Sequence, residues 1–151
     1  MLFAVFKKLR LNPTPIVLVG TEFENRANFT TVGAFGVVCL KPIFYISLKN
    51  SHHSTAGVRE TGFFSVNLPS ADMVQQTDYC GMVSGNDADK SAVFDVFYDE
   101  CGNAPMIKES PMNYPARLWI SMRLKALPSF SEKSSPLLLM KTARRMESPI
   151  R

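Results

Sequence analysis

The segment IVLVGT at residues 16–21 is the stretch that decides the class of fold. It follows Pro13-Thr14-Pro15, which breaks any preceding helix, and it is rich in β-branched residues over the length of one strand. Gly20 lies near its end. We therefore predict a buried strand here.

Further short elements follow on the C-terminal side of this strand. Ser54 or Thr55 can cap a short helix that ends at Gly62, and a second short helix begins near Ser70. Segments with the length and composition of strands recur at residues 29–38, 43–48, 63–68 and 94–98. Many short strands with few helices favour a mainly β, barrel-like fold over a parallel doubly wound sheet.

Length and composition restrict the class of protein. The chain has 151 residues, 46% of them hydrophobic, which is enough for one domain with a core. Its longest apolar runs, at residues 16–19 and 34–40, are too short for a membrane-spanning helix. Residues 1–6 are too short for the apolar region of a signal peptide. The odd set of three widely spaced cysteines indicates no disulfide framework, so we expect a cytoplasmic protein without a membrane partner.

The net charge of +4 is concentrated near the C-terminus. Residues 1–114 hold 9 Lys and Arg against 11 Asp and Glu, whereas residues 115–151 hold 8 against 2. This composition predicts an N-terminal extension at 1–12, an organised domain at 13–114 and a poorly ordered basic tail at 115–151. The tail lacks interleaved aromatic residues, so we do not expect binding to nucleic acid.

Motifs for phosphate loops, metals and nucleophilic catalysis are not evident. Gly33-x-x-Gly36 lacks the third glycine of a dinucleotide fingerprint. The only histidines, His52 and His53, are adjacent and have no nearby cysteine, so a metal site is not predicted. A hydrolase remains a weak alternative because no Gly-x-Ser-x-Gly motif occurs.

Polar residues that suit a phosphate group gather near the predicted strand and helix ends. They are Thr30-Thr31, Lys49-Asn50-Ser51, Ser54-Thr55 and Lys90. Hydroxyl groups, lysines and the backbone N–H groups of a helix N-terminus are the donors that a phosphomonoester requires. The same residues are also common on protein surfaces, so by themselves they leave the function open.

The order of the motifs resembles that of a known family. From Pro13 to Tyr114 the chain carries PIVLVGT at 15–21, then Asn28 with Thr30-Thr31, Lys41-Pro42, TGFFSVNLP at 61–69, Asp78-Tyr79-Cys80-Gly81, Ser84-Gly85, Asp89-Lys90 and Ala104-Pro105. In this order and spacing, the sequence resembles the flavin reductase-like family of FMN-binding split barrels, which includes flavoredoxin-type proteins. The resemblance implies a split β-barrel.

The resemblance also implies a cofactor, FMN, and residues that would bind it. Asn28, Thr30, Thr31 and the backbone around Ala34 would face the flavin. Leu48, Lys49 and Asn50 would border the isoalloxazine and the ribityl chain, and Ser54, Thr55 and Lys90 would bind the phosphate. Catalysis would consist mainly of positioning NADH or NADPH over the flavin, so no catalytic residue is assigned.

The C-terminal part departs from the family pattern. No closing strand of the type Phe-x-Gly-Glu is readable after Tyr114, and Phe35 and Ser91 stand where relatives often have other residues. Skipping two bases within the codons of residues 130–137 permits the peptide FGEIVAT. We therefore hypothesise an altered reading frame, which would leave the barrel incomplete at the C-terminus, with unpaired edges. The hypothesis fails if the coding DNA shows no insertion or deletion near codons 112–118.

The expected function is that of an FMN-binding oxidoreductase. The resemblance implies a homodimer that passes electrons from NAD(P)H, or from a redox partner protein, through the flavin. The alternatives are a noncatalytic flavin-binding electron carrier and an inactive, truncated family member. The sequence does not decide whether the protein is an enzyme.

Overall fold

A computed structural model describes residues 14–39, 43–98, 104–123 and 136–142. Its first two strands, β1 (Val17–Phe23) and β2 (Arg26–Val32), form an antiparallel hairpin. Glu24 and Asn25 both have a positive φ, 51° and 58°, as a two-residue type I′ turn requires. The predicted strand is therefore confirmed and continues two residues further into this turn.

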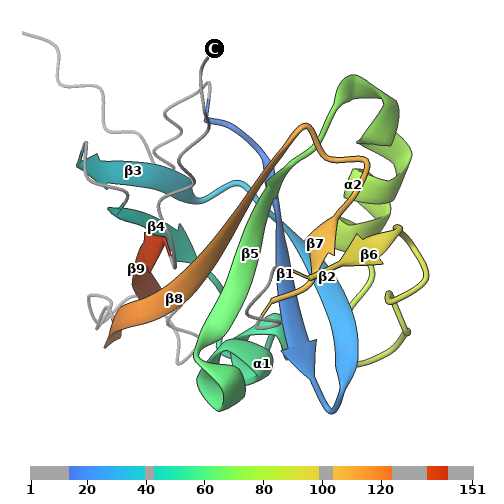
Figure 1. Ribbon diagram of the computed structural model, residues 1–151. Coiled ribbons are helices and arrows are strands. Elements are labelled where there is room, and N and C mark those ends of the chain that lie inside the picture. Colours follow the sequence, from blue (N-terminus) through green and yellow to red (C-terminus); the bar gives the residue numbers. More distant parts are fainter. Residues whose placement is uncertain (1–13, 40–42, 99–103, 124–135, 143–151) are drawn as a thin grey trace, which may run out of the picture.

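The strands form one sheet of seven and one of two (Figure 1). The larger sheet has the order β2-β1-β5-β8-β9-β4-β3 and every neighbouring pair is antiparallel. Its further strands are β3 (Phe35–Cys39), β4 (Ile43–Ser47), β5 (Phe63–Leu68), β8 (Met112–Arg123) and β9 (Pro136–Thr142), and the smaller sheet pairs β6 (Val96–Phe97) with β7 (Met106–Ile107). The predicted mainly β fold is confirmed.

The helices are short and lie between strands. Helix α1 (His53–Thr61) connects β4 to β5, and Gly62 ends it with φ 72° and a bond from its N–H to the carbonyl of Val58 at 2.9 Å. A 3₁₀ turn, η1 (Ala71–Met73), leads into α2 (Val74–Met82). The residue before α1 is His52 rather than Ser54 or Thr55, and no side chain caps the helix. None of the described helices is long and apolar enough to cross a membrane.

The core lies on both faces of strand β1. Val17 and Val19 pack with Phe64, Val66 and other residues inside the curved sheet. Leu18, on the opposite face of β1, packs with the residues that α2 and β7 bring against the sheet. Because both faces are covered, the strand is continuously hydrophobic instead of alternating.

The backbone forms strands beyond the expected domain boundary at Tyr114. Strand β8 runs through this residue to Arg123, and Ala116 within it is buried. β8 pairs with β5 and with β9, and β9 pairs with β4. The local sequence does not predict this strand, because it contains Pro115 and charged residues. The strand forms because it pairs with β5 and β9. Residues 124–135 and 143–151 lie outside the described part, where the poorly ordered tail stays a prediction.

Candidate functional site

A buried polar network joins strand β2 to the first turn of α1. The Asn28 side-chain amide donates to Ser54 Oγ at 2.9 Å, and Ser54 Oγ lies 2.6 Å from Thr30 Oγ1. Asn28 and Ser54 are buried, and the burial makes each lost hydrogen bond costly. The structure thus brings together two residues predicted to face the flavin and one predicted to bind the phosphate.

The segment before α1 is fixed against the same end of the helix. Thr55 Oγ1 donates to the Lys49 carbonyl at 2.8 Å, and the Thr55 N–H donates to the His52 carbonyl at 2.9 Å. Lys49 itself is exposed, and the first turn of α1 holds no acidic residue. A cationic side chain therefore lies at a helix N-terminus, where the backbone dipole also favours an anion.

Lys90 is almost completely buried and binds the C-terminal end of α2. Its Nζ donates to the carbonyl of Val83 at 2.7 Å and to that of Cys80 at 3.2 Å. Burial lowers the pKa of Lys90 below its usual value, and a weaker effect of Cys80 opposes this change. Two of the three ammonium donors are thus used within the fold.

His52 lies within electrostatic range of both lysines. Its Nδ1 is buried and has no hydrogen-bond partner among the described residues. Burial lowers the pKa of His52, and the positive charges of Lys49 and Lys90 lower it further. Both lysines therefore act on one imidazole, and Thr55 binds the carbonyl of one of them. Of the residues predicted to bind the phosphate, Ser54 and Thr55 lie in the first turn of α1, whereas Lys90 bonds to the C-terminal end of α2.

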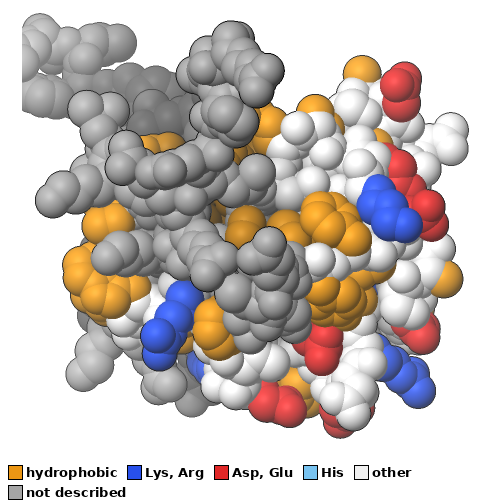
Figure 2. All heavy atoms as spheres, in the orientation of Figure 1, with side chains coloured by type: hydrophobic (Ala, Val, Ile, Leu, Met, Phe, Trp, Pro, Cys, Tyr) orange, Lys and Arg blue, Asp and Glu red, His pale blue; other side chains and the backbone are white. Residues whose placement is uncertain are grey.

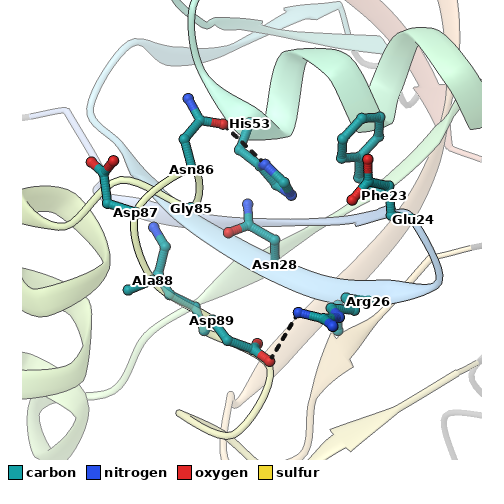
Figure 3. Close-up of a pocket in the computed structure, with 12 residues that line it drawn as sticks. Phe23, Glu24, Arg26, Asn28, His53, Gly85, Asn86, Asp87, Ala88 and Asp89 are labelled. Atoms are coloured by element: carbon teal, nitrogen blue, oxygen red, sulfur yellow. Dashed lines mark hydrogen bonds and ion pairs between the residues drawn. The ribbon is translucent and has the colours of Figure 1, made fainter.

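A cavity of about 420 Å³ opens beside this end of the helix (Figure 3). His53 contacts the Phe23 ring edge-to-face at 4.8 Å between centroids, and its Nδ1 lies 3.1 Å from Asn86 Oδ1. Figure 3 shows the turn of β1 and β2 on one side and residues 85–89 on the other, joined by an exposed ion pair of Arg26 and Asp89 at 3.8 Å. The lining residues are Phe23, Glu24, Arg26, Ala27, Asn28, His53 and residues 85–90.

Position 85 requires a glycine because the loop after α2 covers Asn28 closely there. A Cβ at this position would collide with Asn28 Oδ1 and lie 3.0 Å from the Cβ of His53. Asn28 Oδ1 is buried beneath the loop and has no partner among the described residues. The loop after α2 therefore closes tightly over the network on β2.

Four predicted site residues lie apart from the polar network. Thr31 Oγ1 donates to the Thr77 carbonyl and so binds α2. Leu48 is buried in the core, whereas Ala34 is exposed and its carbonyl accepts from the Ser47 N–H at 3.0 Å. Asn50 Oδ1 accepts from Arg59 at 2.7 Å.

Reading the sequence missed several residues that line the cavity, namely Phe23, Arg26, His53 and Asn86. Two signals existed. The sequences Asn25-Arg26 and Ser84-Gly85 are typical of turns, and the paired histidines have two candidate roles from the sequence alone, metal ligation and a catalytic triad. Nothing local to these segments indicates that they meet, because they are far apart along the chain.

Comparison with known proteins identifies the family. A sequence profile described as "Flavin reductase like domain" matches residues 9–126. The chain belongs to this family. A flavoredoxin from Methanosarcina acetivorans is 32% identical, with a TM-score of 0.83 over 95% of this chain and 74% of that one. No curated protein sequence matches significantly.

Other solved structures in the comparison support the same fold. The flavoredoxin of Desulfovibrio vulgaris (Miyazaki F) is 25% identical to this family member, with a TM-score of 0.77 over 95% of this chain and 75% of that one. An FMN-binding protein from Thermus thermophilus is 17% identical, with a TM-score of 0.79 over 95% and 80%. The resemblance and the flavin reductase-like barrel inferred from the motifs are confirmed.

The residues at the start of α1 fit the phosphate of a flavin nucleotide. Such a phosphate carries about 1.5 to 2 negative charges at neutral pH. Lys49, the remaining donor of Lys90 and the unpartnered ring nitrogen of His52 are chemically suited to it. The loop at residues 85–90, which also carries Lys90, brings the carboxylates of Asp87 and Asp89 to the cavity, and these would repel the same group. The charge distribution therefore favours the α1 side for the phosphate.

Proposed function

We propose that this flavin reductase-like protein binds FMN and transfers electrons through it. The observations that carry the proposal are the flavin reductase-like domain over residues 9–126 and the hydrogen-bonded side chains of Asn28, Thr30 and Ser54 at the acid-free N-terminus of α1. Bound FMN supplies reversible redox chemistry that protein side chains lack. The chain's own residues bind and orient the cofactor.

The roles of these residues follow from their contacts. The exposed Lys49 ammonium neutralises the phosphate, and Thr55 holds the Lys49 backbone in place through its carbonyl. The buried bonds of Ser54 to Asn28 and Thr30 fix the helix against β2, so the donors are positioned before the ligand arrives. Charge-assisted hydrogen bonds of this kind are stronger than neutral ones.

We infer that NADH or NADPH reduces the flavin and that the protein acts as a cytoplasmic homodimer. Family membership supports these finer proposals. The second candidate is an electron carrier that receives electrons from a redox partner protein, which the 32% identity to a flavoredoxin favours. Anaerobic mixing of the FMN-loaded protein with NADH and with NADPH separates them, because a reductase bleaches the flavin absorbance and a carrier does not.

The binding experiment compares FMN with riboflavin, which lacks the phosphate. We expect the full chain to bind FMN, and Lys49→Ala to weaken FMN binding at least 10-fold while leaving riboflavin binding within about 2-fold. Lys108→Ala, which removes another exposed lysine, is the control and should change neither. Fluorescence titration measures both ligands. Absence of FMN binding by the folded wild-type chain would refute the proposal and leave an inactive family member.

A further inference from the structure

The side chain of Asn86 bridges the loop after α2 to the start of α1. Its Nδ2 donates to the carbonyl of Ser51 at 3.3 Å, and its Oδ1 lies 3.1 Å from His53 Nδ1 (Figure 3). Because the amide nitrogen is the donor in the first bond, the amide oxygen accepts from the Nδ1–H of His53. Asn86 is thus bonded both to the segment that enters α1 and to the first residue of the helix.

The loop holds Asn86 in a fixed position. The Asn86 N–H donates to Ser84 Oγ at 3.1 Å, and the Ser84 carbonyl accepts from the N–H groups of residues 87 and 88 at 3.1 Å each. Lys90 then ties the end of the loop to the last carbonyls of α2. A side chain on an ordered turn loses little freedom when it forms a bridge, so the bridge exists before a ligand arrives.

The bridge lies between the cavity beside α1 and the residues proposed for the phosphate. Asn86 and His53 line this cavity of about 420 Å³, whereas Lys49, Ser51 and Thr55 are not among the described residues that line it. Asn86 therefore contacts the cavity on one side and the segment before α1 on the other. The cavity has the size of a small-molecule site, but a group bound at the start of α1 reaches it only past this bridge.

A flavin dinucleotide would require the space behind the bridge. In FMN the phosphate is the end of the molecule, whereas in FAD it is joined to an adenylate. From a phosphate at the start of α1, the adenylate either displaces Asn86 and enters the cavity or stays in water beside the exposed Lys49. The first route breaks both bonds of Asn86, and the second adds few contacts with the protein. Neither route favours the larger cofactor.

The charges behind the bridge also oppose the second phosphate of FAD. Glu24, Asp87 and Asp89 bring three carboxylates to the cavity, and Arg26 pairs with Asp89 at 3.8 Å. Figure 2 shows acidic and basic side chains interspersed along the right-hand edge of the molecule, where α2 and β2 lie in Figure 1. Local carboxylates rather than a broad field of one sign therefore act on a ligand that enters the cavity.

We propose that Asn86 is a specificity-determining residue that closes the flavin site beyond the terminal phosphate, so that the protein selects FMN over FAD. The proposal rests on the proposed binding of FMN at the start of α1. Asn86 acts by excluding the adenylate, and its own hydrogen bonds go to Ser51 and His53.

The test compares the dissociation constants of FMN and FAD for the full chain by calorimetric titration. We expect the wild-type chain to bind FMN about 10-fold more tightly than FAD. Asn86→Ala removes both bonds of the bridge and should reduce this preference about 5-fold, because FAD gains affinity while FMN changes less than about 2-fold. Gln76→Ala is the matched control, since it removes an exposed amide on α2 outside the cavity lining, and it should leave both constants unchanged.

A second variant opens the bridge from the helix. His53→Ala removes the partner of Asn86 Oδ1, places a good helix former in α1 and keeps the bond to Ser51, so it should reduce the preference in the same direction by a smaller factor. This variant tests the bridge even if Asn86→Ala fails to fold. Both variants would weaken FMN and FAD equally if Asn86 only supported the fold, and that unchanged ratio would overturn the proposal.

The wild-type chain supplies two further outcomes. Equal affinity for FMN and FAD would overturn the selection by Asn86 while leaving FMN binding intact. A folded wild-type chain that binds neither flavin would refute the proposed function and this inference with it. The two failures are therefore distinguishable in the same titrations.

Discussion

The start of α1 and an apolar groove use the same barrel in opposite ways. At α1, the hydroxyl and amide groups of Asn28, Thr30 and Ser54 bond to one another, and the lysine side chains of Lys49 and Lys90 act on the neighbouring His52. In the groove formed by β3, β4, β5 and β8, the side chains of the described lining residues, which are Phe35, Val37, Ile43, Phe44, Val66, Leu68 and Tyr114, are almost entirely carbon. The first surface selects by charge and hydrogen-bond geometry, and the second selects by apolar shape alone. The binding chemistry of each surface therefore follows from the side-chain groups that have no partner within the fold there.

The largest loss of folding stability is expected when a large side chain of the groove wall is truncated. Phe44→Ala removes a buried ring that contacts Phe35 and Phe64, so unfolding should become easier by about 3–5 kcal/mol. Urea denaturation measures the change. Val38→Ala, at an exposed position on the neighbouring strand, should cost less than about 1 kcal/mol. Equal losses in the two variants would mean that the groove wall is not part of the core.

A smaller effect is expected at the polar surface. Ser54→Ala leaves the Asn28 amide and the Thr30 hydroxyl without their shared partner, which should cost about 1–3 kcal/mol of stability. The exposed Ser121 provides the control, since Ser121→Ala should change stability by less than about 0.5 kcal/mol. If both variants unfold at the same urea concentration, the network does not hold α1 against β2.

The smallest effect is expected in the pH dependence of folding stability. Burial, Lys49 and Lys90 lower the pKa of His52 in the folded state below the unfolded value of 6.5. The unfolded chain therefore binds more protons between these two pKa values, so this histidine makes stability fall as the pH drops below about 6.5 and the loss levels off below the folded pKa. His52→Gln should make the urea midpoint less sensitive to pH between 7.5 and 5. An unchanged pH dependence would show that burial and the two lysines do not lower the pKa of His52 in the folded protein.

Two lysines near the start of α1 differ in burial and in their hydrogen-bond partners. Lys49 is exposed and supplies its carbonyl to Thr55, whereas Lys90 is buried and bonds to the end of α2. The resemblance in sequence implies that Lys49 borders the isoalloxazine and ribityl chain and that Lys90 binds the phosphate. Only the packing of the loop after α2 against β2 shows that one of them also anchors a helix.

Much of the scaffold was predictable because it depends on local pattern. The segments 16–21, 43–48 and 63–68 have strand composition, and Gly62 supplies the left-handed residue that ends α1. Strand β8 was missed at Tyr114, because Pro115 and nearby charges obscure its pattern and its pairing partners lie far away in sequence. The direction of Leu48 into the core was missed for a similar reason.

The amino-acid sequence by itself determined the β-rich class, the family and the supply of hydroxyl and lysine groups that a phosphate would require. The tertiary structure decided which of those groups bond to each other, which one lies against α2, and where carbon surface remains open. The physical reason is that strand formation and helix ends depend on neighbours along the chain, whereas the partner of a buried polar or apolar side chain depends on elements that only folding brings together.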